Sequence, residues 1–194
     1  RFEALPYADV PAFLAKLHER VSVGRLALEA LILTAARSSE IRLARWSEID
    51  MDKATWTVPA ERMKAGKKHI VPLSEAAVSV FKRAAEFRTR GSDLVFPGAK
   101  RSRPLSDMTL LKILRDMKVD ATVHGFRSSF RDWCAEETSV PGEVAEPALA
   151  HAIPNKVEAA YRRTDFFEKR RKLMDAWAAF CSASSATVVR LASP

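Results

Sequence analysis

Two residues three positions apart, His124 and Arg127, form an HxxR element where a helix is expected to begin. Residues at this spacing lie about 60° apart around a helix, so we expect both side chains to point to one place on the solvent side. Both donate hydrogen bonds, and the positive end of the helix dipole favours an anion there. The element predicts a phosphate site, although a surface His and a surface Arg often occur at this spacing without one.

A second group with suitable chemistry lies earlier in the chain. Arg37 directly follows an apolar run that ends at Ala36, and Glu40 stands three residues later. A guanidinium at the end of a buried helix needs a partner, and Glu40 can orient it while leaving part of the fork for an oxyanion. The alternative is a purely structural ion pair between Arg37 and Glu40.

Three further features carry reactive or cationic side chains. Lys64 stands in a turn that contains glycine, together with Lys67 and Lys68. His151 follows Leu-Ala, and ten residues later comes Tyr161, one of only two tyrosines. Taken singly, the lysines are equally well explained as a solvated basic turn.

The order of these features resembles the catalytic domain of tyrosine recombinases. The features are Arg37 with Glu40, Lys64 before His69-Ile-Val-Pro-Leu-Ser74, His124-x-x-Arg127, Leu149-Ala-His151 and Tyr161. The stretch Tyr161-Arg-Arg-Thr-Asp165, followed by Glu168-Lys-Arg-Arg171 and Met174-Asp-Ala-Trp177, is similar to prophage and genomic-island integrases. The resemblance runs from about Ala27 to Phe180 and therefore covers most of the chain.

The resemblance implies DNA strand cleavage and rejoining for site-specific recombination, without a metal or other cofactor. Its nucleophile is Tyr161, whose hydroxyl attacks a phosphodiester to leave a 3′-phosphotyrosyl bond and a free 5′-hydroxyl. Arg37 and Arg127 would hold the non-bridging oxygens, with His151 as a further donor. Lys64 would protonate the 5′-oxygen, and His124 would accept the proton of the tyrosine. Rejoining reverses these steps and needs no ATP.

The same resemblance implies the partners. They are double-stranded attachment-site DNA, three more copies of the full-length protein in a tetramer, and accessory DNA-bending or directionality proteins. Phosphate contacts are expected from Lys67, Lys68, Arg101 and Arg103. The location implied is the cytoplasm of a prokaryote, and the fragment alone is expected to be monomeric. Two alternatives stay open: a type IB topoisomerase-like enzyme, and an inactive DNA-binding module that kept the fold.

Composition sets the outer limits. The 194 residues carry 32 Lys and Arg against 24 Asp and Glu, a net charge of +8, and 47% are hydrophobic, enough for a sizeable core. The longest apolar run, Leu26 to Ala36, is too short to span a membrane. Cys134 and Cys181 lie outside any CxxC motif, which argues against a disulfide scaffold or thiolate zinc site. The histidines lack the close paired spacing of zinc ligands, so no metal is expected.

Domain organisation follows from the two ends. Because the chain opens on Arg1, we expect it to be cut from a longer protein whose N-terminal part holds DNA-binding domains. Residues 1–181 are expected to form the catalytic domain. Residues 182–194, which are rich in Ser and Ala, are expected to be a flexible tail.

Periodicity predicts a mainly α domain with a small antiparallel sheet, an α+β fold. Strands are expected at Thr55–Val58 and His69–Leu73, joined as a hairpin, with a turn before them at Ile49–Asp52. The expected helices are Val21–Ala36, Ile41–Trp46, Glu75–Phe87, one that begins after Ser106 or Asp107, His124–Glu137, Gly142–His151, Asn155–Arg163 and Asp165–Cys181. Pro147 is a departure, since a proline inside the helix before His151 would displace that histidine.

Overall fold

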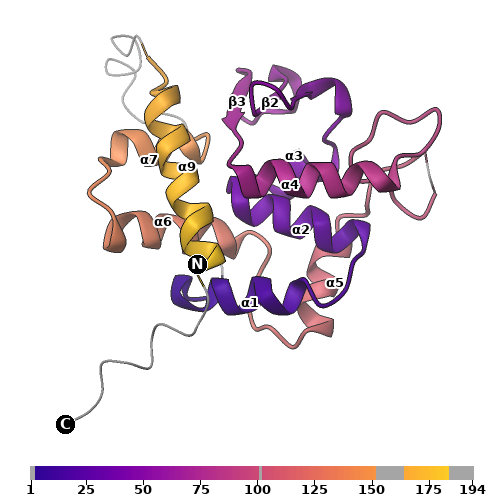
Figure 1. Ribbon diagram of the computed structural model, residues 1–194, viewed down its shortest axis with the longest axis horizontal. Coiled ribbons are helices and arrows are strands. Elements are labelled where there is room, and N and C mark those ends of the chain that lie inside the picture. Colours follow the sequence, from indigo (N-terminus) through magenta and orange to yellow (C-terminus); the bar gives the residue numbers. More distant parts are fainter. Residues whose placement is uncertain (1–2, 101, 152–163, 184–194) are drawn as a thin grey trace.

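The computed structural model describes residues 3–100, 102–151 and 164–183, and it is mainly helical with one small sheet, which confirms the expected fold class (Figure 1). Its α-helices are α1 (Val10–Leu17), α2 (Val23–Thr34), α3 (Ser38–Arg42), α4 (Glu75–Ala84), α5 (Thr109–Asp116), α6 (Gly125–Glu137), α7 (Gly142–Ala148) and α9 (Phe167–Ser182). Its strands are β1 (Ile49–Asp50), β2 (Thr55–Val58) and β3 (His69–Pro72). Short 3₁₀ turns cover Tyr7–Asp9, Trp46–Glu48, Ala60–Arg62 and Ala85–Phe87.

Helix α2 is the centre of the core, as its dense apolar sequence predicts. The hydroxyl of Ser22 accepts a hydrogen bond from the Arg25 amide at 3.2 Å and caps the first turn. Every residue from Leu26 to Thr34 is buried, because α4, α5, α6 and α9 pack around this helix (Figure 1). The helix ends at Ala35, which has a left-handed backbone with φ 51°.

The sheet is antiparallel in the order β1-β2-β3, which confirms the predicted hairpin. Trp56 and Val58 are buried while Thr55 and Thr57 are half-buried, the alternation expected of a strand. The prediction of a turn at Ile49–Asp52 is wrong for Ile49 and Asp50. Ile49 and Asp50 pair with Trp56 and Thr55 as β1, and only the following residues form the turn. Two residues are too few to show a period, so pairing with β2 decides their conformation.

Two helices differ from the sequence expectation. Helix α1 was not expected, yet Val10, Phe13, Leu14 and Leu17 lie on one face and are buried. The short helix predicted at Ile41–Trp46 is instead α3, which begins at Ser38. It starts earlier because the Glu40 carboxylate accepts a hydrogen bond from the Arg37 amide at 2.9 Å and so caps the first turn.

The C-terminal helices confirm most of the remaining prediction. Helices α6 and α9 meet through an aromatic cluster in which Trp133 and Trp177 lie 5.1 Å apart between ring centroids. The Trp177 indole also donates to the Ile32 carbonyl oxygen at 2.8 Å, which fixes α9 to α2. The helix predicted at Asn155–Arg163 lies outside the described residues. None of the described helices is long and apolar enough to cross a membrane.

Candidate active site

Arg127 is the buried centre of the candidate site. Its side chain emerges from the first turn of α6, and only 4% of the residue is exposed. Nη1 donates to the Ala35 carbonyl oxygen at 2.5 Å and Nη2 donates to the Leu149 carbonyl oxygen at 2.6 Å. The expectation that Arg127 points to solvent is therefore wrong, because its guanidinium reaches inward to two backbone segments.

Those two carbonyls stand at the C-terminal ends of helices. Ala35 follows the last residue of α2, and Leu149 follows the last residue of α7. The negative ends of both helix dipoles therefore meet at one guanidinium, and this attraction favours the charged form of Arg127. The same two bonds fix the positions of α2, α6 and α7 relative to one another.

Arg37 lies beside Arg127 and has the partner that its sequence context predicts. Its Nη1 lies 2.8 Å from Oε1 of Glu40, and its backbone amide donates to Oε2 of the same carboxylate at 2.9 Å. Glu40 exposes only 4% of its side chain, whereas Arg37 exposes 21%. Nη2 of Arg37 lies 3.4 Å from the Ala150 carbonyl oxygen. Glu40 thus orients Arg37, and the guanidinium keeps an edge toward solvent.

His151 joins the two arginines despite the proline before it. The structure places Pro147 near the end of α7, and Ala150 then turns the chain with a left-handed φ of 50°. This turn brings Nε2 of His151 to 3.1 Å from Nη2 of Arg127. The displacement expected from Pro147 does not separate the histidine from Arg127, because the proline stands in the last turn.

Glu146 completes this part of the site and was not predicted from the sequence. Nδ1 of His151 lies 2.5 Å from Oε2 of Glu146, whose other oxygen pairs with Arg131 at 3.0 Å. With Arg127 donating to Nε2, the histidine carries its proton on Nδ1 and donates it to Glu146. In this arrangement Nε2 of His151 is an acceptor. The role of His151 as a phosphate donor therefore stays a prediction.

His124 stands at the solvent side of the same cluster. The residue is exposed overall at the N-cap of α6, but partial desolvation of its ring lowers its pKa, with further lowering by the charges of Arg127 and Arg37. A lowered pKa leaves the imidazole neutral at pH 7, the form that accepts a proton. The amides of Gly125 and Arg127 already bond to Thr122 and His124, so the predicted help from the helix N-terminus is reduced.

Gly125 has its own packing reason to be glycine. A Cβ built at this position would lie 2.2 Å from the carbonyl oxygen of Glu3 and 2.9 Å from Cα of Ala4. The Thr122 amide also donates to the Glu3 carbonyl oxygen at 3.0 Å. The N-terminal residues therefore lie directly against the start of α6 and hold it in place.

The electrostatics of the cluster show an excess of positive charge. The pKa of Arg127 is lowered to about 10, first by burial and then by the charge of Arg37, while Glu40 and Glu146 oppose the lowering. Those two carboxylates bond to Arg37 and to His151, and among the described residues no carboxylate forms an ion pair with Arg127. The arrangement therefore suits an incoming anion that touches both guanidinium groups.

The predicted basic residues outside the cluster lie on exposed turns. Lys64, Lys67 and Lys68 are exposed on the turn between β2 and β3, where Gly66 has a left-handed φ of 64°. Arg103 is exposed on a loop closed by a bond from the Gly98 amide to the Arg103 carbonyl oxygen at 2.7 Å.

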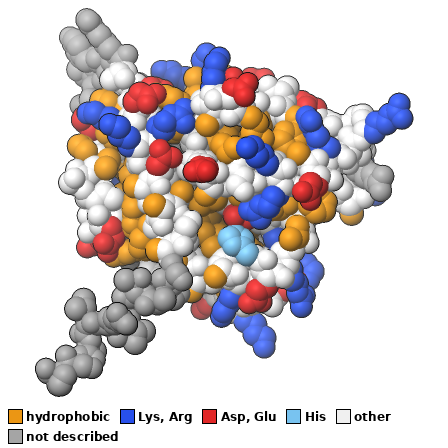
Figure 2. Space-filling view, in the orientation of Figure 1, with side chains coloured by type: hydrophobic (Ala, Val, Ile, Leu, Met, Phe, Trp, Pro, Cys, Tyr) orange, Lys and Arg blue, Asp and Glu red, His pale blue; other side chains and the backbone are white. Residues whose placement is uncertain are grey.

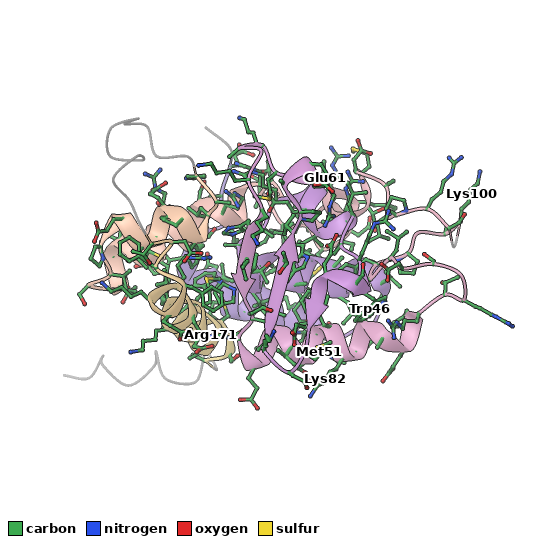
Figure 3. The ribbon with its side chains drawn as sticks, turned by 90° about the horizontal axis from the view of Figure 1, so that it is seen from above. Trp46, Met51, Glu61, Lys82, Lys100 and Arg171 are labelled. Atoms are coloured by element: carbon green, nitrogen blue, oxygen red, sulfur yellow. The ribbon has the colours of Figure 1, made fainter. Side chains whose placement is uncertain are left out.

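Figure 3 shows Lys100 on this loop, far from the sheet. Arg101 and Tyr161 lie outside the described residues. On the face seen in Figure 2, Lys and Arg side chains alternate with acidic and apolar ones, so that face has no continuous basic surface.

His69 is a neighbour of the site to which the sequence analysis gave no role beyond its place in a strand. It is half-buried at the start of β3, and its pKa is lowered to about 4. Burial is the largest cause, followed by the charge of Arg170, with Glu40 opposing and Arg37 adding a smaller lowering. His69 is therefore near enough to Arg170 and to the Arg37–Glu40 pair for their charges to act on it. Among the described residues, no cluster of side chains is suited to hold a metal ion.

Comparison of the sequence with known proteins identifies the family of this chain. The chain matches the phage integrase family over residues 4–168 and belongs to that family, which confirms the resemblance to tyrosine recombinase catalytic domains. It is 38% identical over 178 residues to the prophage integrase IntZ of Escherichia coli (strain K12), covering 90% of this chain and 44% of that protein. It is 34% identical over 197 residues to the integrase of Enterobacteria phage P4, covering 91% and 45%. The chain thus spans less than half the length of these relatives.

Solved structures show the same fold at lower identity. An integrase from mycobacterium phage Brujita matches with a TM-score of 0.66 and 20% identity, over 90% of this chain and 58% of that one. A lambda integrase tetramer bound to a Holliday junction matches with a TM-score of 0.59 and 21% identity, over 79% and 48%. At these identities the likeness establishes the fold and no more.

Proposed function

We propose that this chain is the catalytic domain of an integrase that cuts and rejoins DNA at attachment sites, to integrate or excise a prophage or genomic island. The observation that carries the proposal is the meeting of Arg37 and Arg127 from positions 90 residues apart, with no carboxylate paired to Arg127 among the described residues. Two guanidinium groups beside each other repel unless an anion lies between them. A DNA phosphodiester supplies that anion.

In the proposed reaction, charge develops on the non-bridging oxygens of the phosphate as the tyrosine attacks. Arg37 and Arg127 are held in place by Glu40 and by the backbone carbonyls, so they stabilise that charge without reorganising. In this proposal the solvent-facing edge of the Arg37 guanidinium contacts one non-bridging oxygen. Burial makes the field of Arg127 strong because little water screens it.

Proton transfers complete the step. The Tyr161 oxygen forms a bond to phosphorus while the bond to the 5′-oxygen breaks. The phenol proton passes to His124, which is neutral because burial and the adjacent arginines lower its pKa. Lys64, from its exposed turn, gives a proton to the leaving 5′-oxygen. A 5′-hydroxyl of a second strand then attacks the phosphotyrosine and reverses these transfers.

The partners proposed are those of the whole protein. The lambda integrase structure is named as a tetramer on a Holliday junction, and we extend such an assembly on double-stranded DNA to the full-length form of this chain. Phosphate contacts are assigned to Lys67, Lys68, Arg101 and Arg103, and additional DNA-binding domains to the part of the protein that precedes this chain. Accessory DNA-bending or directionality proteins belong to the same proposal, as does action in the prokaryotic cytoplasm.

The test is trapping of the covalent intermediate on a nicked suicide duplex that carries the junction sequence of the encoding element. Wild-type full-length protein is expected to give a protein–DNA band on a denaturing gel, and Tyr161→Phe is expected to give none. The chain offers a matched control in its other tyrosine, since Tyr7 donates to Glu137 at 2.7 Å and has no place in the proposed chemistry. Tyr7→Phe should therefore keep the band.

Each other result has a definite meaning. A band that persists in Tyr161→Phe shows that the nucleophile is a different residue. Absence of any band with full-length protein on its verified site favours an inactive DNA-binding module. Relaxation of supercoiled plasmid without recombinant products favours a type IB topoisomerase-like enzyme.

A further inference from the structure

A second buried arginine, Arg170, lies in the first turns of α9. Only 1% of the residue is exposed, and all three guanidinium nitrogens are bonded. Nε donates to the Asp165 carbonyl oxygen, Nη2 to Oδ2 of Asp165, and Nη1 to the Ile70 carbonyl oxygen, each at 2.8 Å. One rigid guanidinium therefore bonds both the chain before α9 and strand β3, and it fixes the distance between them.

The fold does not need a charge at this position to bury α9. Leu173, Met174 and Trp177 already place the apolar face of the helix in the core. Burying a guanidinium is costly even when it is paired, and apolar side chains often replace such pairs without loss of stability. An apolar side chain could not make the directional bond to the Ile70 carbonyl oxygen. The role of Arg170 therefore depends on what strand β3 positions.

Strand β3 is an edge strand of the sheet, and it begins immediately after the turn that carries Lys64. Arg170 occupies an edge carbonyl of this strand, while the next residue, Arg171, donates to the carbonyl oxygens of Lys53 and Ala54 at 3.0 and 3.2 Å. Figure 3 shows Arg171 beside the sheet. The start of α9 therefore holds the sheet at two points, which restricts rotation of the hairpin relative to the helices.

The same contact lies next to the phosphate site. His69, the first residue of β3, is close enough to Arg170 and to Arg37 for both charges to lower its pKa, while Glu40 and Asp165 oppose them. The start of strand β3 is thus near enough to the Arg170–Asp165 pair and to the Arg37–Glu40 pair for the charges of both to act on it. A shift of β3 therefore changes where the Lys64 turn stands relative to the two arginines.

We propose that Arg170 is a positioning residue that, by bonding Ile70 and Asp165 together, holds the β2–β3 hairpin so that Lys64 reaches the 5′-oxygen leaving group. This inference rests on the proposed function, since it assumes the proton transfer assigned there to Lys64. The step itself is the transfer of one proton from the Lys64 ammonium to the 5′-oxygen as its bond to phosphorus breaks. Arg170 touches neither DNA nor the reacting atoms.

The experiment separates placement of the acid from a general loss of structure. Full-length protein is assayed for covalent adduct on two suicide duplexes, one ordinary and one with sulfur in place of the scissile 5′-oxygen. A thiolate leaves without protonation, so this second duplex does not need the general acid. Arg170→Lys keeps the charge but loses the fork. Lys64→Ala removes the acid itself.

The matched control is Arg83→Lys. Arg83 also bonds a carboxylate, since its Nη2 donates to both oxygens of buried Glu29 at 2.8 and 2.9 Å, but it lies on α4 outside the proposed machinery. Arg170→Lys and Lys64→Ala are expected to slow cleavage of the ordinary duplex about 100-fold and of the sulfur duplex by less than about 5-fold. Arg83→Lys should change both rates less than about 2-fold.

The inference is overturned if Arg170→Lys slows both duplexes equally, or slows neither, while Lys64→Ala is rescued by sulfur. If wild type forms no adduct, the proposed function itself fails; if sulfur does not rescue Lys64→Ala, the general-acid role assigned to Lys64 fails, and in either case the inference falls too. Asp165→Asn tests the same contact in case Arg170→Lys misfolds. This substitution disturbs the fold less, because the Asp165 side chain is 61% exposed. It should show a smaller defect with the same rescue, and an unrescued defect counts against the inference.

Discussion

Arg127 and Arg170 are both buried, and both hold backbone carbonyls, yet their surroundings differ in one respect. Arg170 pairs with the carboxylate of Asp165, which raises its pKa against the lowering by burial. Within the part of the chain that the structure describes, Arg127 has only carbonyl oxygens and a histidine nitrogen as partners, and the charge of Arg37 adds to the lowering of its pKa by burial. A guanidinium balanced by a carboxylate fixes structure, whereas one balanced only by dipoles retains attraction for an anion.

The largest difference between the two arginines is expected in catalysis. Arg127→Lys keeps a positive charge but loses the bidentate fork, so we expect adduct formation on the ordinary duplex to fall about 1,000-fold. The sulfur duplex should not rescue it, because the loss concerns the non-bridging oxygens and not the leaving group. Single-turnover adduct formation on both duplexes measures this, and rescue by sulfur would erase the distinction from Arg170→Lys.

The next largest effect concerns His69, whose pKa is lowered by the charges of both Arg170 and Arg37. Its pKa is about 4 in the folded protein against about 6.5 in the unfolded chain, so the unfolded chain takes up the proton first as pH falls. The free energy of unfolding should therefore decrease from pH 6.5 to pH 4, by up to about 3 kcal/mol from this group.

Urea unfolding at pH 7.5, 5.5 and 4.5 measures the effect in wild type and in His69→Gln. Carboxylates titrate in the same range, so the quantity to compare is the difference between the two proteins at each pH. We expect wild type to lose more stability than His69→Gln below pH 6.5. Parallel curves would show that the histidine has the same pKa in both states.

A smaller effect tests whether the site around Arg127 attracts an anion. Sulfate at ten times its Kd should raise the free energy of unfolding by about 1.4 kcal/mol, beyond potassium chloride at equal ionic strength. Sulfate also stabilises proteins generally, so the control is the variant pair: Arg127→Lys should lose most of the specific increase and Arg170→Lys should keep it. Equal increases in both variants would contradict the comparison.

The smallest effect concerns the backbone beside Arg37. Ala150 has a left-handed φ of 50°, and its carbonyl oxygen lies near Nη2 of Arg37. Because this conformation costs a non-glycine residue about 1 kcal/mol, Ala150→Gly should stabilise the protein by about that amount. Ala145→Gly, inside α7, should instead destabilise it by about 1 kcal/mol. Thermal and urea unfolding distinguish the two signs.

The sequence predicts those parts of the molecule whose causes are local. Helix α2, the β2–β3 hairpin and the Arg37–Glu40 pair follow from periodicity or from groups three residues apart. The burial of Arg127 cannot be predicted in this way, because its partners are backbone carbonyls 92 and 22 residues away. Every residue has a backbone carbonyl, so the sequence does not indicate which ones will bond. Glu146 and His69 were missed for a similar reason: only the chain reversal at Ala150 and the placement of β3 give them their neighbours.

The bonds of Arg127 also set a point in the synthesis of the chain before which the site cannot exist. One bond needs the end of α2 and the other needs residue 149, so a ribosome must release at least that much chain before the guanidinium has both partners. A nascent or truncated chain that stops earlier has exposed basic side chains but lacks the fixed arginine. Under the proposed function, such products would contact DNA but lack the geometry to cleave it.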